Sequence, residues 1–214
     1  MIKKHMGLSR LYLILMMMLS LLMLPTTVIR AETAVEPQAL IQDATERMLQ
    51  ALKDNKTELE ADSSVIYGLV KEILIPNFDF AKMSKLALGK NWRKASDVQK
   101  TRFTEEFRLL LVRTYSTAML EYTDEKIHFL PFKGDLSKKK VKVKMDVIQA
   151  GGPSIPMAMS LYLNSEGAWK VYDLKIDGIS LVTNYRSTFA TEIRNDGMDK
   201  LIDRLASKNE KVKA

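Results

Sequence analysis

The sequence predicts an α+β fold, in which a curved antiparallel sheet of about four strands packs on N-terminal and C-terminal helices. Apolar residues recur at helical spacing from about residue 40 to residue 118, alternate with polar residues between about 127 and 176, and return to helical spacing after Ser180. Helices, a meander of strands and then helices again are typical of α+β proteins. No repeat, linker or low-complexity segment interrupts the order, so we expect one domain over residues 32–214.

The first 31 residues have the three-part layout of a secretory signal peptide. Met1–Arg10 is short and basic, Leu11–Leu24 is apolar, and Pro25 precedes a small residue at Ala31. The 14 residues of the apolar run would span about 21 Å as a helix, less than the ~30 Å of a hydrocarbon core. We therefore expect cleavage after Ala31, with Ala34 as a second candidate, rather than a retained membrane anchor.

Composition excludes several classes of function. The formal net charge is +7, but residues 1–31 hold four basic residues and no acid, so residues 32–214 carry 29 basic and 26 acidic residues, or +3. This small excess argues against a nucleic-acid partner. The absence of cysteine excludes disulfides, thiolate catalysis and Cys-based zinc sites, and two histidines are too few for a multi-histidine metal centre. An exported chain without cysteine fits a bacterial periplasm.

Two helices are predicted in the first part of the chain. One begins after Pro37 and carries an apolar stripe made of Leu40, Ile41, Ala44, Met48, Ala51 and Leu52. The second runs from Val65 to Leu74 and is stopped by Pro76.

Two further helices follow, each with a recognisable start. Asp79 can cap a short helix that runs to Leu88, with Gly89 at the position of a left-handed C-cap. Ser96 and Gln99 form a capping box. The long helix after it presents one face made of Phe103, Phe107, Leu110, Leu111, Thr114, Tyr115 and Ala118.

Alternation of apolar and polar residues along the chain predicts four strands. They cover Ile127–Leu130, Val141–Val147, Met157–Leu163 and Ala168–Ile176, with a turn at 151–153. Two helices close the chain.

Ser180 is expected to cap the first of these helices, which carries Leu181, Val182, Tyr185, Phe189 and Ile193, and Gly197 ends it. A final short helix then holds Met198, Leu201, Ile202 and Leu205 before a charged tail.

Catalytic groups are scarce. There is no G-x-S-x-G motif, and His128 lies in a predicted strand, where we expect a structural role. Ser137 and Lys140 match S-x-x-K only because they belong to a lysine run. Adjacent acids such as Glu105 and Glu106 do not converge on a helix. We predict neither an enzyme nor a cofactor or metal site.

Lysines gather at 138–140 and continue at Lys142 and Lys144. They fit the solvent face of a strand, where lysine discourages edge pairing. The alternative is a docking face for an acidic partner or an anionic lipid surface.

Methionines are frequent among the predicted core residues, and methionine adapts to irregular space. A strand face of Met157, Met159 and Leu161 opposite the long helix would make a suitable cavity wall. The same residues would also serve as ordinary core.

Three segments resemble the MlaC family of periplasmic phospholipid-binding proteins, also called toluene-tolerance auxiliary components. They are IPNFDFAKMSKLALGKNWRKAS at 75–96, FTEEFRLLLVRTYSTAMLEY at 103–122 and WKVYDLKIDGISLVTNYRSTFATEIRNDGMDKLIDRL at 169–205. The resemblance covers essentially the whole chain after the leader, in order.

The resemblance implies a monomeric carrier in the periplasm of a Gram-negative bacterium. It would shuttle a phospholipid between an outer-membrane lipoprotein–porin complex and an inner-membrane ABC transporter, and so maintain outer-membrane lipid asymmetry. Members bury acyl chains between the curved sheet and the helices and leave the head group near solvent. The alternatives are an interaction module with a filled core and no cargo, or a lipid hydrolase.

Periodicity selects the candidate lipid-binding residues, since the family motifs do not identify individual lipid contacts. The candidates for the head-group mouth are Arg93 and Arg113. The candidates for the acyl chains are Phe78, Phe80, Met83, Leu86, Phe107, Leu110, Leu111, Tyr115, Met119, Val143, Met145, Met157, Met159, Leu161, Val171, Val182 and Tyr185.

Overall fold

The computed structural model describes residues 36–120, 126–149 and 152–213, which all belong to one compact unit, Ala34–Ala214. The predicted signal peptide and both of its cleavage candidates lie outside the described residues, as does Gly151 of the predicted turn. No described helix is long and apolar enough to cross a bilayer.

The sheet is an antiparallel meander in the order β1-β2-β3-β4-β5. Its strands are β1 (Lys126–Phe129), β2 (Lys140–Ile148), β3 (Ile155–Leu163), β4 (Trp169–Ile176) and β5 (Ile179–Ser180). The predicted α+β class is confirmed, and the four predicted strands are all present. The fifth, β5, has only two residues, too few to show a period of two in the sequence.

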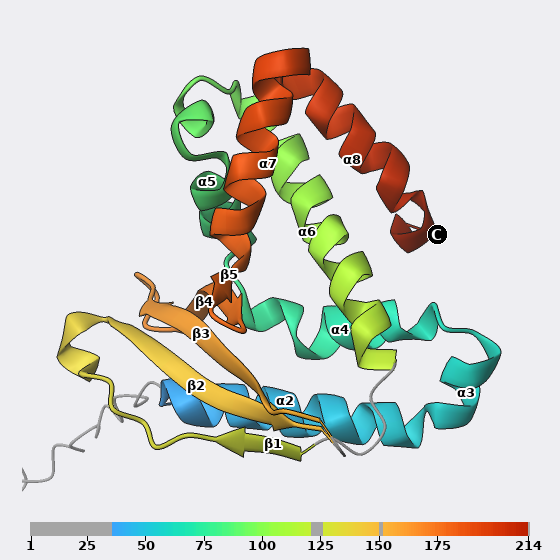
Figure 1. Ribbon diagram of the computed structural model, residues 1–214, viewed down its shortest axis with the longest axis vertical. Helices are drawn as coiled ribbons and strands as arrows, with labels where there is room; N and C mark the ends of the chain where they lie inside the picture. Colours follow the sequence, from blue (N-terminus) through green and yellow to red (C-terminus); the bar gives the residue numbers. More distant parts are fainter. Residues whose placement is uncertain (1–35, 121–125, 150–151, 214) are drawn as a thin grey trace, which may run out of the picture. The chain divides into compact units, whose positions relative to one another are not determined.

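Helices precede and follow the sheet (Figure 1). Before it are α2 (Pro37–Asp54), α3 (Lys56–Ala61), α4 (Val65–Ile73), η2 (Ile75–Asn77), α5 (Phe80–Leu88), η3 (Gly89–Arg93) and α6 (Asp97–Leu120). The short turn η4 (Leu136–Lys138) lies between β1 and β2, and α7 (Leu181–Asp196) and α8 (Met198–Lys213) follow β5. The sequence did not predict α3.

The last helix is longer than predicted, because α8 continues through the charged tail to Lys213. Leu201 and Leu205 are buried in the core beside α6. Farther along, the buried amide of Asn209 donates to the backbone carbonyl and the carboxylate of Glu106 on α6, at 2.8 and 3.0 Å. These contacts with α6 stabilise the charged end of α8, whose composition alone does not predict a helix.

The predicted helix starts are confirmed by hydrogen bonds. The Asp79 carboxylate accepts from the amide three residues on at 2.8 Å, and Ser180 does the same for α7 at 3.2 Å. Ser96 and Gln99 exchange side-chain to backbone bonds of 3.0 and 3.2 Å, which completes the capping box. Gly197 ends α7 with a φ of 87°, a conformation that favours glycine.

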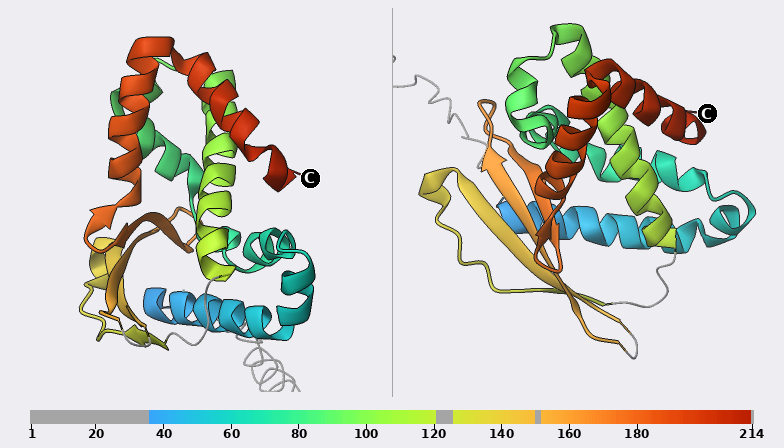
Figure 2. Two further views of the ribbon diagram at one scale, coloured as in Figure 1. Left: turned by 45° about the vertical axis from the view of Figure 1, so that its right-hand side comes forward. Right: turned by 45° about the horizontal axis from the view of Figure 1, so that its top comes forward.

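Buried apolar residues form three clusters that leave a space between them. The first joins α5, α6, α7 and α8 around Phe103, Phe107 and Phe189. The second lies between the sheet and α2, which runs along one face of the sheet (Figure 2). The third joins α2, α3, α4 and Val112 of α6. Phe78 packs against both the first and the second cluster, so it stands where they meet.

Candidate functional site

An apolar cavity of about 160 Å³ opens between β3, β4, α2, α4, α5 and α6. It lies where the three core clusters meet. Its described walls consist of Ile41, Ala44, Thr45, Val70, Leu74, Ile75, Asn77, Phe78, Phe80, Met83, Leu111, Val112, Tyr115, Ser116, Met119, Met157, Met159, Leu174 and Leu181.

The wall carries no charged side chain among the described residues, and two of its four polar side chains bond to nearby carbonyl groups. The Thr45 hydroxyl donates to the Ile41 carbonyl at 2.7 Å, and the Asn77 amide donates to the Ile73 carbonyl at 3.1 Å. Both bonds stay within the residue's own segment of chain, so neither group needs a partner across the cavity. The surface offered to a ligand is therefore hydrocarbon and thioether.

Ser116 is the exception on this wall. Its residue is 1% exposed, and its Oγ has no hydrogen-bond partner among the described residues. Leaving a buried hydroxyl unbonded costs free energy, typically about 1–3 kcal/mol. A ligand that brought an acceptor oxygen to this point of α6 would recover that cost.

Burial raises the pKa of two tyrosines above the ordinary phenol value, which already lies well above physiological pH. Desolvation raises the pKa of Tyr115 to about 12, and the nearby phenol of Tyr185 adds to the effect. Desolvation also raises the pKa of Tyr185, against the opposing influence of a hydrogen bond from Thr114 and the charge of Arg113. Tyr115 lines the cavity and Tyr185 packs edge-on against Phe107 at 5.3 Å. No phenolate therefore disturbs the apolar wall.

The two phenylalanines of the wall are positioned by the segment between α4 and α5. Phe78 bridges Val171 at the sheet, and the Asp79 amide donates to the Val171 carbonyl at 2.9 Å. Asp79 also starts α5 and accepts a hydrogen bond from the Tyr162 hydroxyl, which raises the pKa of Tyr162 to about 12. The rings of Phe78 and Phe80 stack with centroids 5.8 Å apart, so the segment brings both to one side of the cavity.

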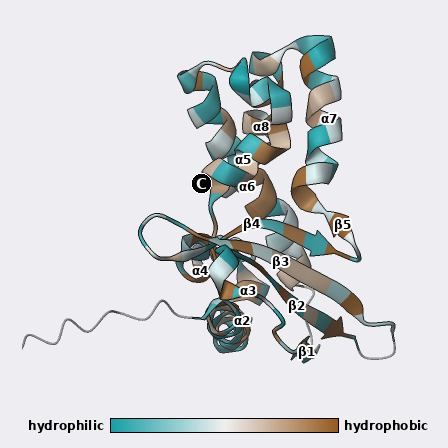
Figure 3. Ribbon diagram, turned by 90° about the vertical axis from the view of Figure 1, so that its left-hand side faces the viewer, coloured by the Kyte–Doolittle hydropathy of each residue, from teal (hydrophilic) through white to brown (hydrophobic). Residues whose placement is uncertain are grey.

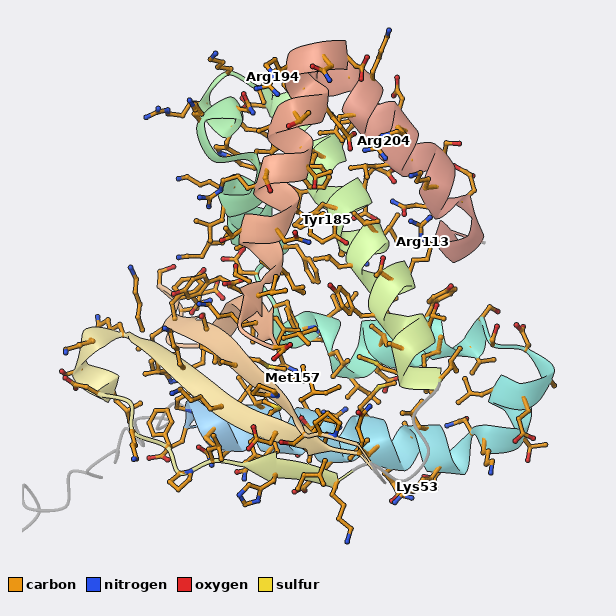
Figure 4. The ribbon with its side chains drawn as sticks, in the orientation of Figure 1. Lys53, Arg113, Met157, Tyr185, Arg194 and Arg204 are labelled. Carbon is orange, nitrogen blue, oxygen red and sulfur yellow. The ribbon has the colours of Figure 1, made fainter. Side chains whose placement is uncertain are left out.

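Part of the predicted acyl-chain set lies together on this wall. Figure 4 places Met157 at the sheet, and Tyr185 and Arg113 farther from it, beside α7 and α6. The predicted residues that line the cavity are Phe78, Phe80, Met83, Leu111, Tyr115, Met119, Met157 and Met159.

The other predicted residues lie in the core clusters rather than on the cavity wall. Phe107, Leu110 and Val182 are buried in the helical cluster, with Leu86 and Tyr185 packed against it. The remainder, in the cluster between sheet and α2, are Val143, Met145, Leu161 and Val171.

Neither predicted mouth arginine is among the residues that line the cavity. Arg113 donates to the Lys208 carbonyl of α8, and Arg93 is exposed at the end of η3. Both belong to the helical part of the fold.

Sequence reasoning missed the walls that α2, α4 and η2 contribute. The missed residues are Ile41, Ala44, Thr45, Val70, Leu74, Ile75 and Asn77, together with Val112, Ser116, Leu174 and Leu181. The apolar stripes of α2 and α4 were visible in the sequence, but their spacing does not tell which partner each helix faces.

The described residues present no group of three or more His, Asp or Glu side chains placed to hold a metal ion. His128 is exposed on β1, beside Asp146 in the register of the sheet.

Comparison with known proteins gives consistent matches. A family model described as "MlaC protein" matches residues 42–207. The chain is 32% identical over 192 residues to toluene tolerance protein ttg2D of Pseudomonas putida, covering 88% of this chain and 87% of that protein. It is 25% identical over 180 residues to the intermembrane phospholipid transport system binding protein MlaC of Haemophilus influenzae, covering 82% of each.

A solved structure is similar in fold as well. It is a phospholipid-binding protein from Ralstonia solanacearum, in complex with a phospholipid. The two chains share a TM-score of 0.74 and 25% sequence identity, over 83% of this chain and 98% of the other.

Proposed function

The chain belongs to the MlaC family, and from this membership we propose that it carries a phospholipid whose acyl chains occupy the apolar cavity. The observation that carries the proposal is the cavity itself, whose described wall holds four polar side chains and no charged one. A diacyl phospholipid has about 30 methylenes, each worth about 0.8 kcal/mol on leaving water, so its passage through water costs about 24 kcal/mol. Burying the acyl chains against an apolar wall removes that cost.

The cavity must widen to take a whole lipid. Two acyl chains occupy roughly 800–900 Å³, near the upper limit of ordinary ligand pockets, whereas the cavity measures about 160 Å³. Met119, Met157 and Met159 line it, and their unbranched thioether side chains can adopt other rotamers. We propose that these methionines fill the space when no lipid is present and withdraw along the wall when acyl chains enter.

Membership of the same family also suggests the compartment and the partners of the carrier. We propose that it works as a periplasmic monomer and shuttles between an outer-membrane lipoprotein–porin complex and an inner-membrane ABC transporter. The Haemophilus influenzae relative is named as the binding protein of an intermembrane phospholipid transport system, which supports this assignment. A binding protein equilibrates with its donor and acceptor, so we propose that an ATPase gives the transfer its direction.

Native mass spectrometry of protein purified without detergent tests the proposal, with organic extraction of the same sample. We expect a mass increment of one phospholipid, and the extract identifies it. A bare protein that also takes no lipid from vesicles would contradict the proposal and favour an interaction module with a filled core.

Ser116 provides a finer test of how the lipid lies. We propose that its hydroxyl donates to an ester carbonyl oxygen of the cargo, since no described group bonds it. A neutral hydrogen bond contributes about 0.5–1.5 kcal/mol. Ser116→Ala should therefore weaken binding of a fluorescent diester lipid by about 3- to 10-fold. Binding of the matching diether lipid, which lacks the carbonyl, should not change.

Equal loss for the diester and diether lipids would show that Ser116 acts only through packing. Ser84→Ala is the matched control, because Ser84 is buried, has no hydrogen-bond partner in the part of the chain that the structure describes, and does not line the cavity.

A further inference from the structure

A second surface of the protein is rich in lysine and lies apart from the cavity. A hollow at the edge of the sheet is lined by Pro131, Phe132, Lys133, Gly134, Lys138, Lys140, Val141, Lys142, Lys144 and Tyr172. We call the five lysines of this hollow the lysine patch. Three of them alternate along β2 with Val141, Val143 and Met145, which are buried toward α2 (Figure 3). The three strand lysines and these buried residues therefore lie on opposite faces of β2.

The patch concentrates the positive charge of the chain. Residues 133–144 contain six lysines and one aspartate, or +5, whereas residues 32–214 as a whole carry +3. The rest of the chain after residue 31 therefore has a net charge of −2. A carrier of nearly balanced charge thus bears one strongly basic surface, and such a surface attracts anions over several ångströms.

Four of the five lysines have no ion pair within the described part of the fold. Lys140, Lys142 and Lys144 lie opposite Tyr162, Ser160 and Ala158 of β3, none of which is acidic. Of the five lysines, only Lys138 forms an ion pair among the described residues, with Asp135 at 3.9 Å. Neighbouring lysines on one face of a strand stand about 7 Å apart. This unbalanced row destabilises the isolated protein and favours a partner that supplies negative charge.

An apolar side chain projects from the same region. Leu136 begins η4, and its 41% exposure makes it one of the few exposed large hydrophobic residues among those described. The turn that presents it is built locally, because the Asp135 carboxylate accepts hydrogen bonds from the amide and hydroxyl of Ser137 at 3.0 and 2.6 Å. Figure 1 draws η4 next to the start of β2, on the side of the sheet away from α8. Leu136 is therefore held outward, in the middle of the basic segment.

From these observations we propose that the lysine patch and Leu136 dock the protein on a membrane surface rich in anionic phospholipid. Lysines near such a surface attract its diffuse charge, and an apolar tip can enter the interface between head groups and acyl chains. An acidic protein surface is less well matched. The basic segment contains no arginine, the residue suited to paired bonds with discrete carboxylates.

Vesicle flotation tests this proposal with the full-length mature chain. Vesicles of phosphatidylglycerol mixed with phosphatidylcholine should retain the protein at low salt, and vesicles of phosphatidylcholine alone should not. Each lysine near an anionic surface strengthens binding about fivefold. Replacing Lys140, Lys142 and Lys144 by glutamine should therefore weaken binding about 100-fold, and raising the salt concentration should release the wild-type protein.

The control variant replaces Lys53, Lys56 and Lys71, which are exposed on α2, α3 and α4, by glutamine. It has the same net charge as the patch variant and should bind the vesicles like the wild type. Leu136→Ser should weaken binding at constant charge. If the control variant lost as much vesicle binding as the patch variant, net charge alone would explain the effect and the proposal would be wrong. Vesicle binding by the patch variant as strong as that of the wild type would also overturn the proposal.

These experiments test the docking surface and the cargo site independently. The pocket-filling variant Met159→Trp is expected to carry less lipid and still float with anionic vesicles. The patch variant is expected to carry lipid in native mass spectrometry and not float. Absence of flotation by the wild-type protein at low salt would exclude membrane docking through the patch and point to an acidic protein partner, while leaving lipid carriage intact.

Discussion

Removing the bound phospholipid should lower the melting temperature of the protein by about 8–16 °C. A ligand that binds only the folded state at a thousand times its Kd adds about 4 kcal/mol to the free energy of unfolding. For a domain of 150–250 residues, each kcal/mol shifts the melting temperature by about 2–4 °C. Calorimetry of loaded and delipidated samples, with lipid loss confirmed by mass spectrometry, measures the difference.

The size of this shift depends on the cavity being the binding site. Acyl chains there would bridge the helical cluster around Phe107 and the sheet cluster around Val143, which meet at Phe78. Adding lipid back should restore the higher melting temperature. An identical melting curve after proven delipidation would mean that the acyl chains lie on the surface instead.

Local sequence signals predicted the helix boundaries well because caps need only neighbouring residues. Asp79, Ser96 and Ser180 each bond to an amide three residues on, a contact that the sequence contains in full. The end of α8 depends instead on Asn209 meeting Glu106, about a hundred residues earlier. No local pattern could have predicted that contact, and so the last helix was predicted too short.

The cavity wall was predictable only in part for a related reason. Met157 and Met159 of β3 were proposed from the strand period, and both line the cavity. Val143 faces the same side of the sheet but is fully buried, because α2 covers β2. Periodicity identifies the face that turns inward. Whether that face meets another side chain or an open space is decided by how α2 and α4 pack, and their stripes alone do not reveal it.

The substitution with the most direct effect on cargo is Met159→Trp, which should reduce lipid occupancy while leaving the fold intact. Met159 is paired with Val143 on β2 and with Leu174 on β4, and both Met159 and Leu174 line the cavity. A rigid indole there replaces a flexible thioether that can move aside. Overfilling a packed space typically costs about 1–3 kcal/mol, so lipid affinity should fall by roughly 5- to 150-fold.

Ala158→Trp is the matched control, since it introduces the same side chain one residue away on the same strand. Ala158 pairs with Lys144 and Lys175 and is absent from the described cavity wall. The control should extract lipid like the wild type, and both variants should keep the wild-type circular dichroism spectrum. Adding lipid should raise the melting temperature of the control by the full amount and that of Met159→Trp by less. If Met159→Trp instead carried a full complement of lipid, this face of β3 could not form the wall of the acyl-chain site, and the chains would have to enter between α2, α4 and α6.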